Sequence, residues 1–253
     1  MPTHDLFLLH LGRIGRPDPA TGRIPWAPVP SYLIRTVGGK TVLIDTGNPA
    51  STIGAETAQP WSDHRVDVRP EDDVVARLAQ IDLRPEDVDL LVSTHFDWDH
   101  CGRHDAFGPA GTESLVQRRQ LSVARGGDPR AIRALWDIPG IRYTAVDGDT
   151  EIEPGLRLLD TPGHAHGHQS VWVETAEGPV LLAIDAVARR INLVTREVPN
   201  WYADPPEAVR TIARLAALAE ETGAYLIHGH ETSQWDALPH SPAPFRRPEQ
   251  SAN

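Results

Sequence analysis

Histidine and aspartate side chains are concentrated in the stretch STHFDWDHCG, residues 93–102. His95, Asp97, Asp99 and His100 fall within six positions, directly after the apolar run VDLLV. Imidazole and carboxylate groups at the end of a buried strand are costly to desolvate unless they are paired or bound to a cation. These residue types ligate divalent metals and carry protons in hydrolysis. For this stretch alone, a solvated loop rich in His and Asp is the alternative interpretation.

Three later segments, TPGHAHGHQS, LLAIDA and LIHGHE, carry the same residue types where strands are expected to end. In chain order they contribute His164, His166, His168, Asp185, His228 and His230. The ends of strands are where α/β folds usually place binding and catalytic residues. The sequence therefore predicts one metal site that is assembled from the ends of several strands.

The segments around these residues have the patterns of alternating strands and helices. Residues 29–47 predict a hairpin that turns at Gly38 and Gly39, and VDLLVST predicts a buried strand. Residues 69–83 and 204–223 predict helices, and SLVQRRQLSVAR predicts a short strand followed by a helix. Further strands are expected at IRYTAV, LRLLDT, HQSVWVET, GPVLLAIDAV and AYLIHGHE.

Length and composition favour a single α/β domain. A chain of 253 residues that is 40% hydrophobic can bury one large core, and we assign that domain to residues 1–238. Residues 239–253 are rich in proline and are predicted to form a flexible tail.

Charge and cysteine content exclude several classes of protein. The formal net charge of −11, with scattered basic residues, argues against nucleic-acid binding. No apolar run is long enough to span a membrane, and the first residues lack the pattern of a secretory signal, so we expect a cytoplasmic protein. Cys101 is the only cysteine, which excludes an intrachain disulfide and a Cys-rich zinc site. Histidine and carboxylate must therefore hold any metal.

The ordered motifs HxDxDH, TPGHAHGHQS, AIDA and HGHE resemble the metallo-β-lactamase superfamily, and specifically its N-acyl homoserine lactonase-like branch. The resemblance runs from about YLIRT to HGHE and includes LVQRRQL and VDGDTEIEPGLRLLDTPGH. It implies an αββα sandwich of two mixed β-sheets flanked by helices, with a dinuclear metal site along one edge of the sheets.

The resemblance also implies a set of ligands for two divalent cations. One cation would be held by His95, Asp97 and His168, the other by Asp99, His100 and His230, with Asp185 bridging both. Within their loops, His168 is preferred because the family's ligand is assigned to GHQS, and His230 because it is assigned to GHE. His164 and Asp45 are expected to orient the ligands.

Asp97 is a departure from the family pattern, which has His at this position. A carboxylate adds negative charge and hardens the site, so Mn²⁺ or Fe²⁺ become alternatives to Zn²⁺, which we expect first. A second departure is Ala188, because lactonases of this branch carry tyrosine three residues after the bridging aspartate. Tyr202 or Tyr143 could supply the missing phenol. The alternative for both is that they are structural residues of the pocket wall or of the core.

The ligand set predicts a metal-dependent hydrolase that opens a small lactone or a related carboxylic ester. Two cations lower the pKa of a shared water and polarise the scissile carbonyl, and Asp99 can carry the proton to the leaving group. A di-iron redox enzyme of the same superfamily, whose relatives have a carboxylate at the second motif position, is one alternative. A non-catalytic metal-binding module is another, and thioester, phosphodiester and carbamate substrates remain open.

Four segments of irregular character are expected to shape the substrate pocket: residues 14–30, 48–66, 126–140 and 189–204. They and the first motif contain Trp26, Trp61, Trp98, Trp136 and Trp201. These tryptophans predict an apolar surface for an acyl chain or a ring, and ordinary core packing is the alternative. Arg189 and Arg190 could meet a substrate carboxylate or form a solvated loop. The predicted partner is a small molecule, and a homodimer is left open.

Overall fold

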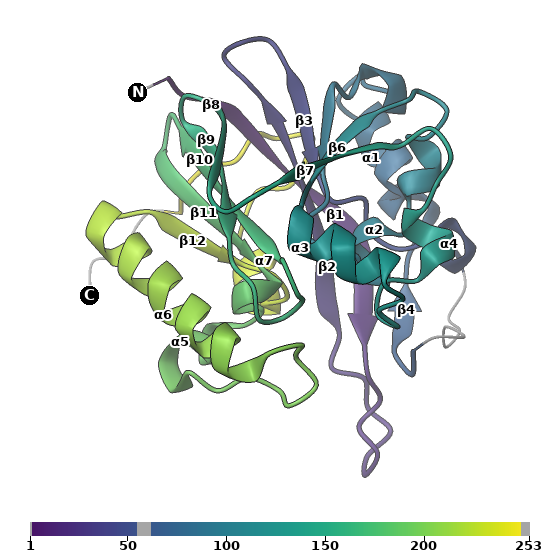
Figure 1. The fold of residues 1–253 in the computed structure, drawn as a ribbon, viewed down its shortest axis with the longest axis vertical. Coiled ribbons are helices and arrows are strands. Elements are labelled where there is room, and N and C mark those ends of the chain that lie inside the picture. Colours follow the sequence, from purple (N-terminus) through teal and green to yellow (C-terminus); the bar gives the residue numbers. More distant parts are fainter. Residues whose placement is uncertain (1, 55–61, 249–253) are drawn as a thin grey trace.

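Two β-sheets form the centre of the molecule in this computed structural model, which describes residues 2–54 and 62–248 (Figure 1). The first sheet has the strand order β4-β1-β2-β3-β5-β6-β7 and the second has the order β12-β11-β10-β9-β8. The strands of the first sheet are β1 (Asp5–Gly15), β2 (Ala27–Arg35), β3 (Thr41–Ile44), β4 (Arg65–Asp67), β5 (Leu90–Val92), β6 (Glu113–Gln117) and β7 (Arg142–Val146). Those of the second are β8 (Thr150–Glu153), β9 (Leu156–Asp160), β10 (Gln169–Thr175), β11 (Gly178–Ile184) and β12 (Tyr225–His228). Both sheets contain parallel and antiparallel pairs.

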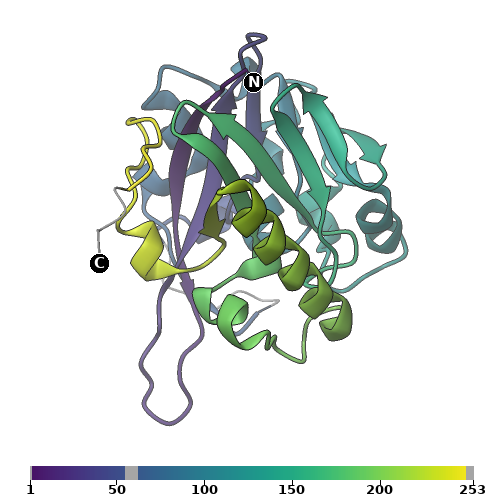
Figure 2. The same ribbon diagram turned by 90° about the vertical axis from the view of Figure 1, so that its left-hand side faces the viewer.

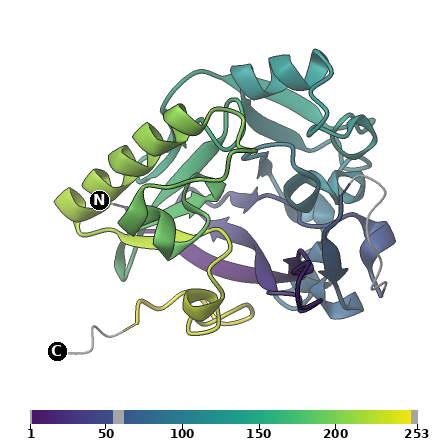
Figure 3. The same cartoon turned by 90° about the horizontal axis from the view of Figure 1, so that it is seen from below.

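Helices cover the outer faces of the sheets. The α-helices are α1 (Val74–Ala79), α2 (Trp98–Cys101), α3 (Arg118–Arg125), α4 (Arg133–Trp136), α5 (Arg190–Thr195), α6 (Pro205–Thr222) and α7 (Thr232–Trp235). Short 3-10 turns occupy Ala50–Thr52, Pro70–Asp72, Pro85–Asp87, His104–Ala106 and Asp185–Val187. Helix α6 crosses the outer face of the second sheet (Figure 2), and the segment around α1 lies on the opposite side of the molecule (Figure 3).

Along each strand, successive apolar side chains point to opposite faces of the sheet, and this alternation produces the layers. In β1, Leu6 and Leu8 join the core between the sheets, whereas Phe7 and Leu9 pack with α1 on the outside. In β11, Leu182 faces the same inner core while its neighbours pack against α6. Because successive side chains of a strand point to opposite faces, each central sheet must be covered on both sides. The predicted αββα sandwich is confirmed.

Most predicted elements are found, with some differences at their ends. The helix predicted over 204–223 begins after Asp204, whose side chain accepts from the Glu207 N–H, and it ends at Gly223, which has a φ of 69°. The helix predicted over 69–83 is shorter, because Asp73 caps α1 and leaves only a 3-10 turn before it. Strands β1, β4 and β8 were not predicted.

The segment predicted to be a flexible tail differs from that expectation over residues 239–248. Phe245 is 3% exposed and belongs to the core between the sheets. The Ser241 and Phe245 N–H groups donate to the carbonyl oxygens of Leu8 and Leu6 in β1. Since β4 pairs only with the last residues of β1, the first half of that strand has an open edge that this segment covers. Residues 249–253 lie outside the described residues.

Within the described part of the chain, the helices lack the length and apolar composition that crossing a membrane requires.

Replacing Phe245 with alanine should lower the free energy of unfolding by about 3 kcal/mol, because a buried aromatic side chain is lost from the core. Denaturant unfolding at fixed metal content measures this change. Val37→Ala, at a side chain that is 65% exposed, is the control and should change the free energy little. Equal effects of the two substitutions would mean that the tail adds nothing to the core.

Candidate metal centre

The four motifs meet at one edge of the two sheets because the strands that carry them end there. Strands β9 and β11 are both antiparallel to β10, and β12 is parallel to β11, so three carboxyl ends share one edge of the second sheet. The segment after β5 joins them, since Thr94 accepts a hydrogen bond from the Gln169 N–H at the start of β10. This contact places the first motif beside the loops of the other sheet.

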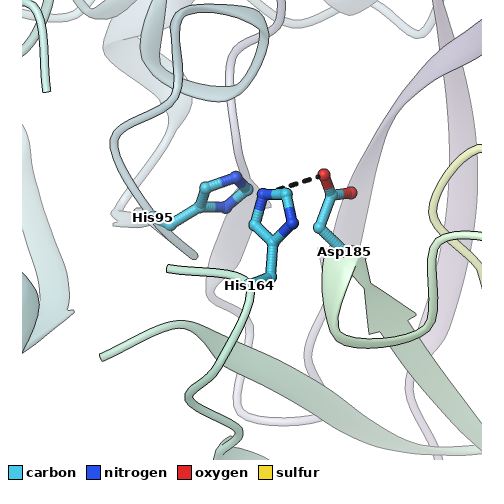
Figure 4. Close-up of side chains that lie close together, drawn as sticks. All are labelled: His95, His164 and Asp185. Carbon is cyan, nitrogen blue, oxygen red and sulfur yellow. Dashed lines mark ion pairs between the residues drawn. The ribbon is translucent and has the colours of Figure 1, made fainter. Parts of the chain in front are cut away.

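Two groups of donor atoms form at this edge. In the first group, His95, His164 and Asp185 offer atoms that lie within 4.8 Å of one another, and Figure 4 shows these side chains pointing toward a common centre. In the second group, Asp99, His100 and His230 do the same. The His95 and His100 ring centroids are 4.1 Å apart, so the groups are adjacent.

Asp185 faces both groups. Its Oδ2 lies 3.3 Å from His164 Nε2, and its Oδ1 lies 3.1 Å from His230 Nε2 and 3.6 Å from His100 Nε2. Burial opposes ionisation of this carboxyl, yet the neighbouring histidines, His230 first, hold its pKa well below the usual value. The carboxylate is therefore in position to be shared between two cations.

Several buried donor atoms in these groups have no hydrogen-bond partner among the residues described. They are His95 Nε2, His100 Nε2, His164 Nδ1 and Asp185 Oδ1. Buried polar atoms in proteins are nearly always satisfied, so several unsatisfied ones within two adjacent groups require an explanation. Nitrogen and carboxylate oxygen are the donors that Zn²⁺ and related cations bind, and this donor set therefore fits divalent metal.

Asp45 lies where it can orient His100. Its Oδ2 is 2.8 Å from His100 Nδ1, and its Oδ1 accepts from the Thr94 N–H at 2.8 Å. His230 is oriented in the same way, because its Nδ1 donates to the Pro28 carbonyl at 2.8 Å. Such contacts fix the tautomer of a ligand-type imidazole and turn its Nε2 toward the metal position.

The TPGHAHGHQS loop differs from its predicted arrangement, because His164 and not His168 joins the first donor group. His168 Nε2 accepts from the Asp185 backbone N–H at 3.2 Å, and its Nδ1 lies 2.9 Å from Thr161 Oγ1. Both of its ring nitrogens are thus engaged by the protein, and burial lowers its pKa well below the usual value. His166 is partly exposed and contacts Arg119 instead of the centre.

Asp97 lies beside the first group and pairs with Arg130, which belongs to none of the four motifs. Arg130 Nε is 3.1 Å from Asp97 Oδ1, and its Nη2 contacts Asp97 Oδ2. Burial opposes ionisation of Asp97, but Arg130, then His164 and His95, hold its pKa well below the usual range. Arg130 lies 33 residues further along the chain, in the segment 126–140 that is expected to shape the pocket, but no motif indicates its pairing with Asp97.

A cavity of about 770 Å³ opens over both donor groups. As predicted, all four irregular segments contribute to its wall, with Ile14, Ser62, Arg130 and Trp201 as one example from each. Apolar side chains make up most of this wall. The space is large enough for a small molecule with an apolar substituent.

Only some of the aromatic residues predicted for the pocket line the cavity as described. Trp98 and Tyr202 line the cavity, and Trp201, which is 57% exposed, stands at its wall. Trp136 is a core residue stacked on Phe96. Three other predicted residues do not line the cavity as described: Trp26 and Arg190 are absent from its lining, and Tyr143 donates to the Trp136 carbonyl. Trp61 falls outside the described residues.

Comparisons with known proteins agree with this geometry. The family model described as "Metallo-beta-lactamase superfamily" matches residues 24–230. An N-acyl homoserine lactonase of Bacillus sp is 34% identical over 212 residues, which are 82% of each chain, and one of Bacillus thuringiensis is 33% identical over 84% of this chain and 85% of its own. A solved N-acyl homoserine lactone hydrolase, with N-hexanoyl-L-homoserine at its catalytic metal centre, superposes with a TM-score of 0.85 at 29% identity and covers 96% of this chain and 100% of its own.

Replacing His230 with alanine should weaken cation binding at the second group by roughly 100-fold or more, which exceeds the usual effect of losing an orienting residue. Titration of the metal-free protein with Zn²⁺ measures this. His228→Ala is the matched control, because His228 is buried two residues away but belongs to neither group. If both variants lose affinity equally, the donor was assigned to the wrong histidine.

Proposed function

The chain belongs to the metallo-beta-lactamase superfamily, and on that premise we propose that it is a dinuclear metallohydrolase that opens the ring of N-acyl homoserine lactones or closely related carboxylic esters. The observation that carries the proposal is the convergence of buried, unsatisfied nitrogen and oxygen donors beneath a mostly apolar cavity. The relatives support lactones as the substrate class, because they are named as N-acyl homoserine lactonases and are of similar length to this chain.

We assign the ligands from the geometry of the donor groups. His95, His164 and Asp185 would hold one cation, and Asp99, His100 and His230 would hold the other, with Asp185 shared. His164 thereby replaces His168 in the assignment, and Asp97 remains an additional carboxylate at the first group. The many imidazole donors favour Zn²⁺, and the carboxylates leave Mn²⁺ or Fe²⁺ as alternatives. When bound, such cations activate a water and polarise the carbonyl of the substrate.

The chain's own residues supply the proton transfers and the hydrogen bonds. Asp99 is buried at the centre and can pass a proton to the alkoxide that leaves when the lactone ring opens. Ala188 lines the cavity where lactonases of this branch carry tyrosine, and the Tyr202 ring lies 4.6 Å from the His164 ring. Burial and then Asp185 raise the pKa of Tyr202, so its phenol stays protonated and can donate to the substrate.

The cavity wall suits the acyl part of such a substrate. Ile14, Trp98, Ile191 and Trp201 offer apolar surface beside the donor groups. Burial of each methylene of an acyl chain against such a surface contributes about 0.8 kcal/mol, so affinity should increase with chain length until the cavity is filled.

Removing metal with a chelator should abolish opening of N-acyl homoserine lactones, and adding Zn²⁺ or Mn²⁺ should restore it. Proton release on ring opening measures turnover, with the corresponding thioesters and phosphodiesters assayed in parallel. Lactone opening by the metal-free protein would contradict the metal-dependent mechanism, and selective turnover of another class would contradict the substrate assignment.

Asp99→Asn should reduce turnover by at least about 100-fold, because the amide cannot shuttle a proton and binds a cation less well. Metal content is measured in the same samples so that loss of the proton carrier is separated from loss of the ion. Asp105→Asn, at an exposed aspartate paired with Arg103, is the control. Undiminished turnover of Asp99→Asn would remove Asp99 from the mechanism.

A further inference from the structure

Arg130 contacts one donor atom of the first group, His164 Nε2, and the carboxylate of Asp97 beside that group. Besides its two contacts with Asp97, its Nη2 lies 2.8 Å from His164 Nε2, and its Nη1 donates to the His164 carbonyl at 2.5 Å. The guanidinium also lies over the Trp201 ring, with Cζ 5.6 Å from the centroid. These contacts restrain the side chain, which is 24% exposed and lines the cavity.

A neutral imidazole nitrogen has one lone pair, which can accept a hydrogen bond or bind a cation but cannot do both. His164 Nε2 lies 2.8 Å from Arg130 Nη2, 3.2 Å from Asp97 Oδ2 and 3.3 Å from Asp185 Oδ2, and of these three groups only the guanidinium carries an N–H that can donate to the lone pair. A cation that binds His164 must therefore displace the Arg130 N–H from this nitrogen. It must also approach a guanidinium that remains charged under all ordinary conditions.

The second group lacks such a competitor. Among the described residues, the ion pairs of Asp99 are with His100 and His230, and no arginine or lysine pairs with any member of this group. The two groups thus share Asp185 but differ in local charge. Asp97 adds one negative charge at the first group, and Arg130 offsets it.

We propose that Arg130 controls occupancy of the first donor group by competing with the cation for His164 Nε2 and Asp97 Oδ2. The first group then binds its cation more weakly than the second, and the protein holds one ion firmly and a second ion only when Arg130 moves aside. This inference rests on the metal centre of the proposed function and assigns a separate role to one residue in it.

Stepwise titration of the metal-free protein with Zn²⁺, together with elemental analysis after dialysis, tests the inference without an activity assay. The wild-type protein should show one tight and one weak step. Arg130→Met, which keeps the apolar stem and removes the charge and the N–H donors, should tighten the weak step at least about tenfold and leave the tight step unchanged. His164→Ala should remove the weak step and so identify it as the first group.

Two further variants serve as controls. Arg130→Lys retains the charge but lacks the planar fork that contacts both Asp97 oxygens and His164, so the affinity of its weak step should fall between those of the wild type and Arg130→Met. Arg133→Met, at an arginine nearby on α4 whose side chain is 82% exposed, should match the wild type. An unchanged or weakened second step in Arg130→Met would overturn the role of Arg130. Absence of Zn²⁺ binding in the wild type would overturn the metal centre itself.

Discussion

Burial of carboxylates and imidazoles at one edge of the sheet pair is the constraint on which the rest of the structure depends. Asp45, Asp99, Asp185, His95 and His100 are all nearly inaccessible to solvent. Uncompensated charges in such surroundings carry a desolvation cost of several kcal/mol each, and the hydrogen bonds among these residues leave donor atoms unsatisfied. Divalent cations would satisfy those atoms and balance the charge. Folding of the site and binding of the metal would then be thermodynamically coupled.

The two sheets hold this site because their strands end at the same edge. Strand β5 delivers the first motif, while β9, β11 and β12 deliver His164, Asp185 and His230. The backbone is unusual where it turns into the site: Asp45 and Ile184 have positive φ values of 60° and 52°. Such strain persists only where surrounding structure enforces it, and here the hydrogen bonds of Asp45 and the packing of Ile184 between the sheets do so.

Charge compensation explains why an aspartate is tolerated at the second position of the HxDxDH motif. Compared with histidine, Asp97 brings an extra negative charge to a centre already rich in carboxylates. Arg130 returns a positive charge through a bidentate contact. The pair keeps the local charge close to that of a neutral imidazole, yet it also places a cationic side chain against His164, with consequences for the metal that an imidazole would not have.

The sequence by itself determined the α/β class and the irregular segments that line the cavity, because periodicity and turn residues are local properties of the chain. The sandwich and the metal site were implied by the resemblance of the four ordered motifs to a known superfamily. That resemblance also indicated Asp45 as a residue that orients an imidazole, which the contact with His100 now supports. Only the tertiary structure brings His164, and not His168, into the first donor group, pairs Arg130 with Asp97, and places Phe245 in the core. Each of these depends on where distant segments meet and on which lone pairs are already occupied, and residue spacing contains no information on either.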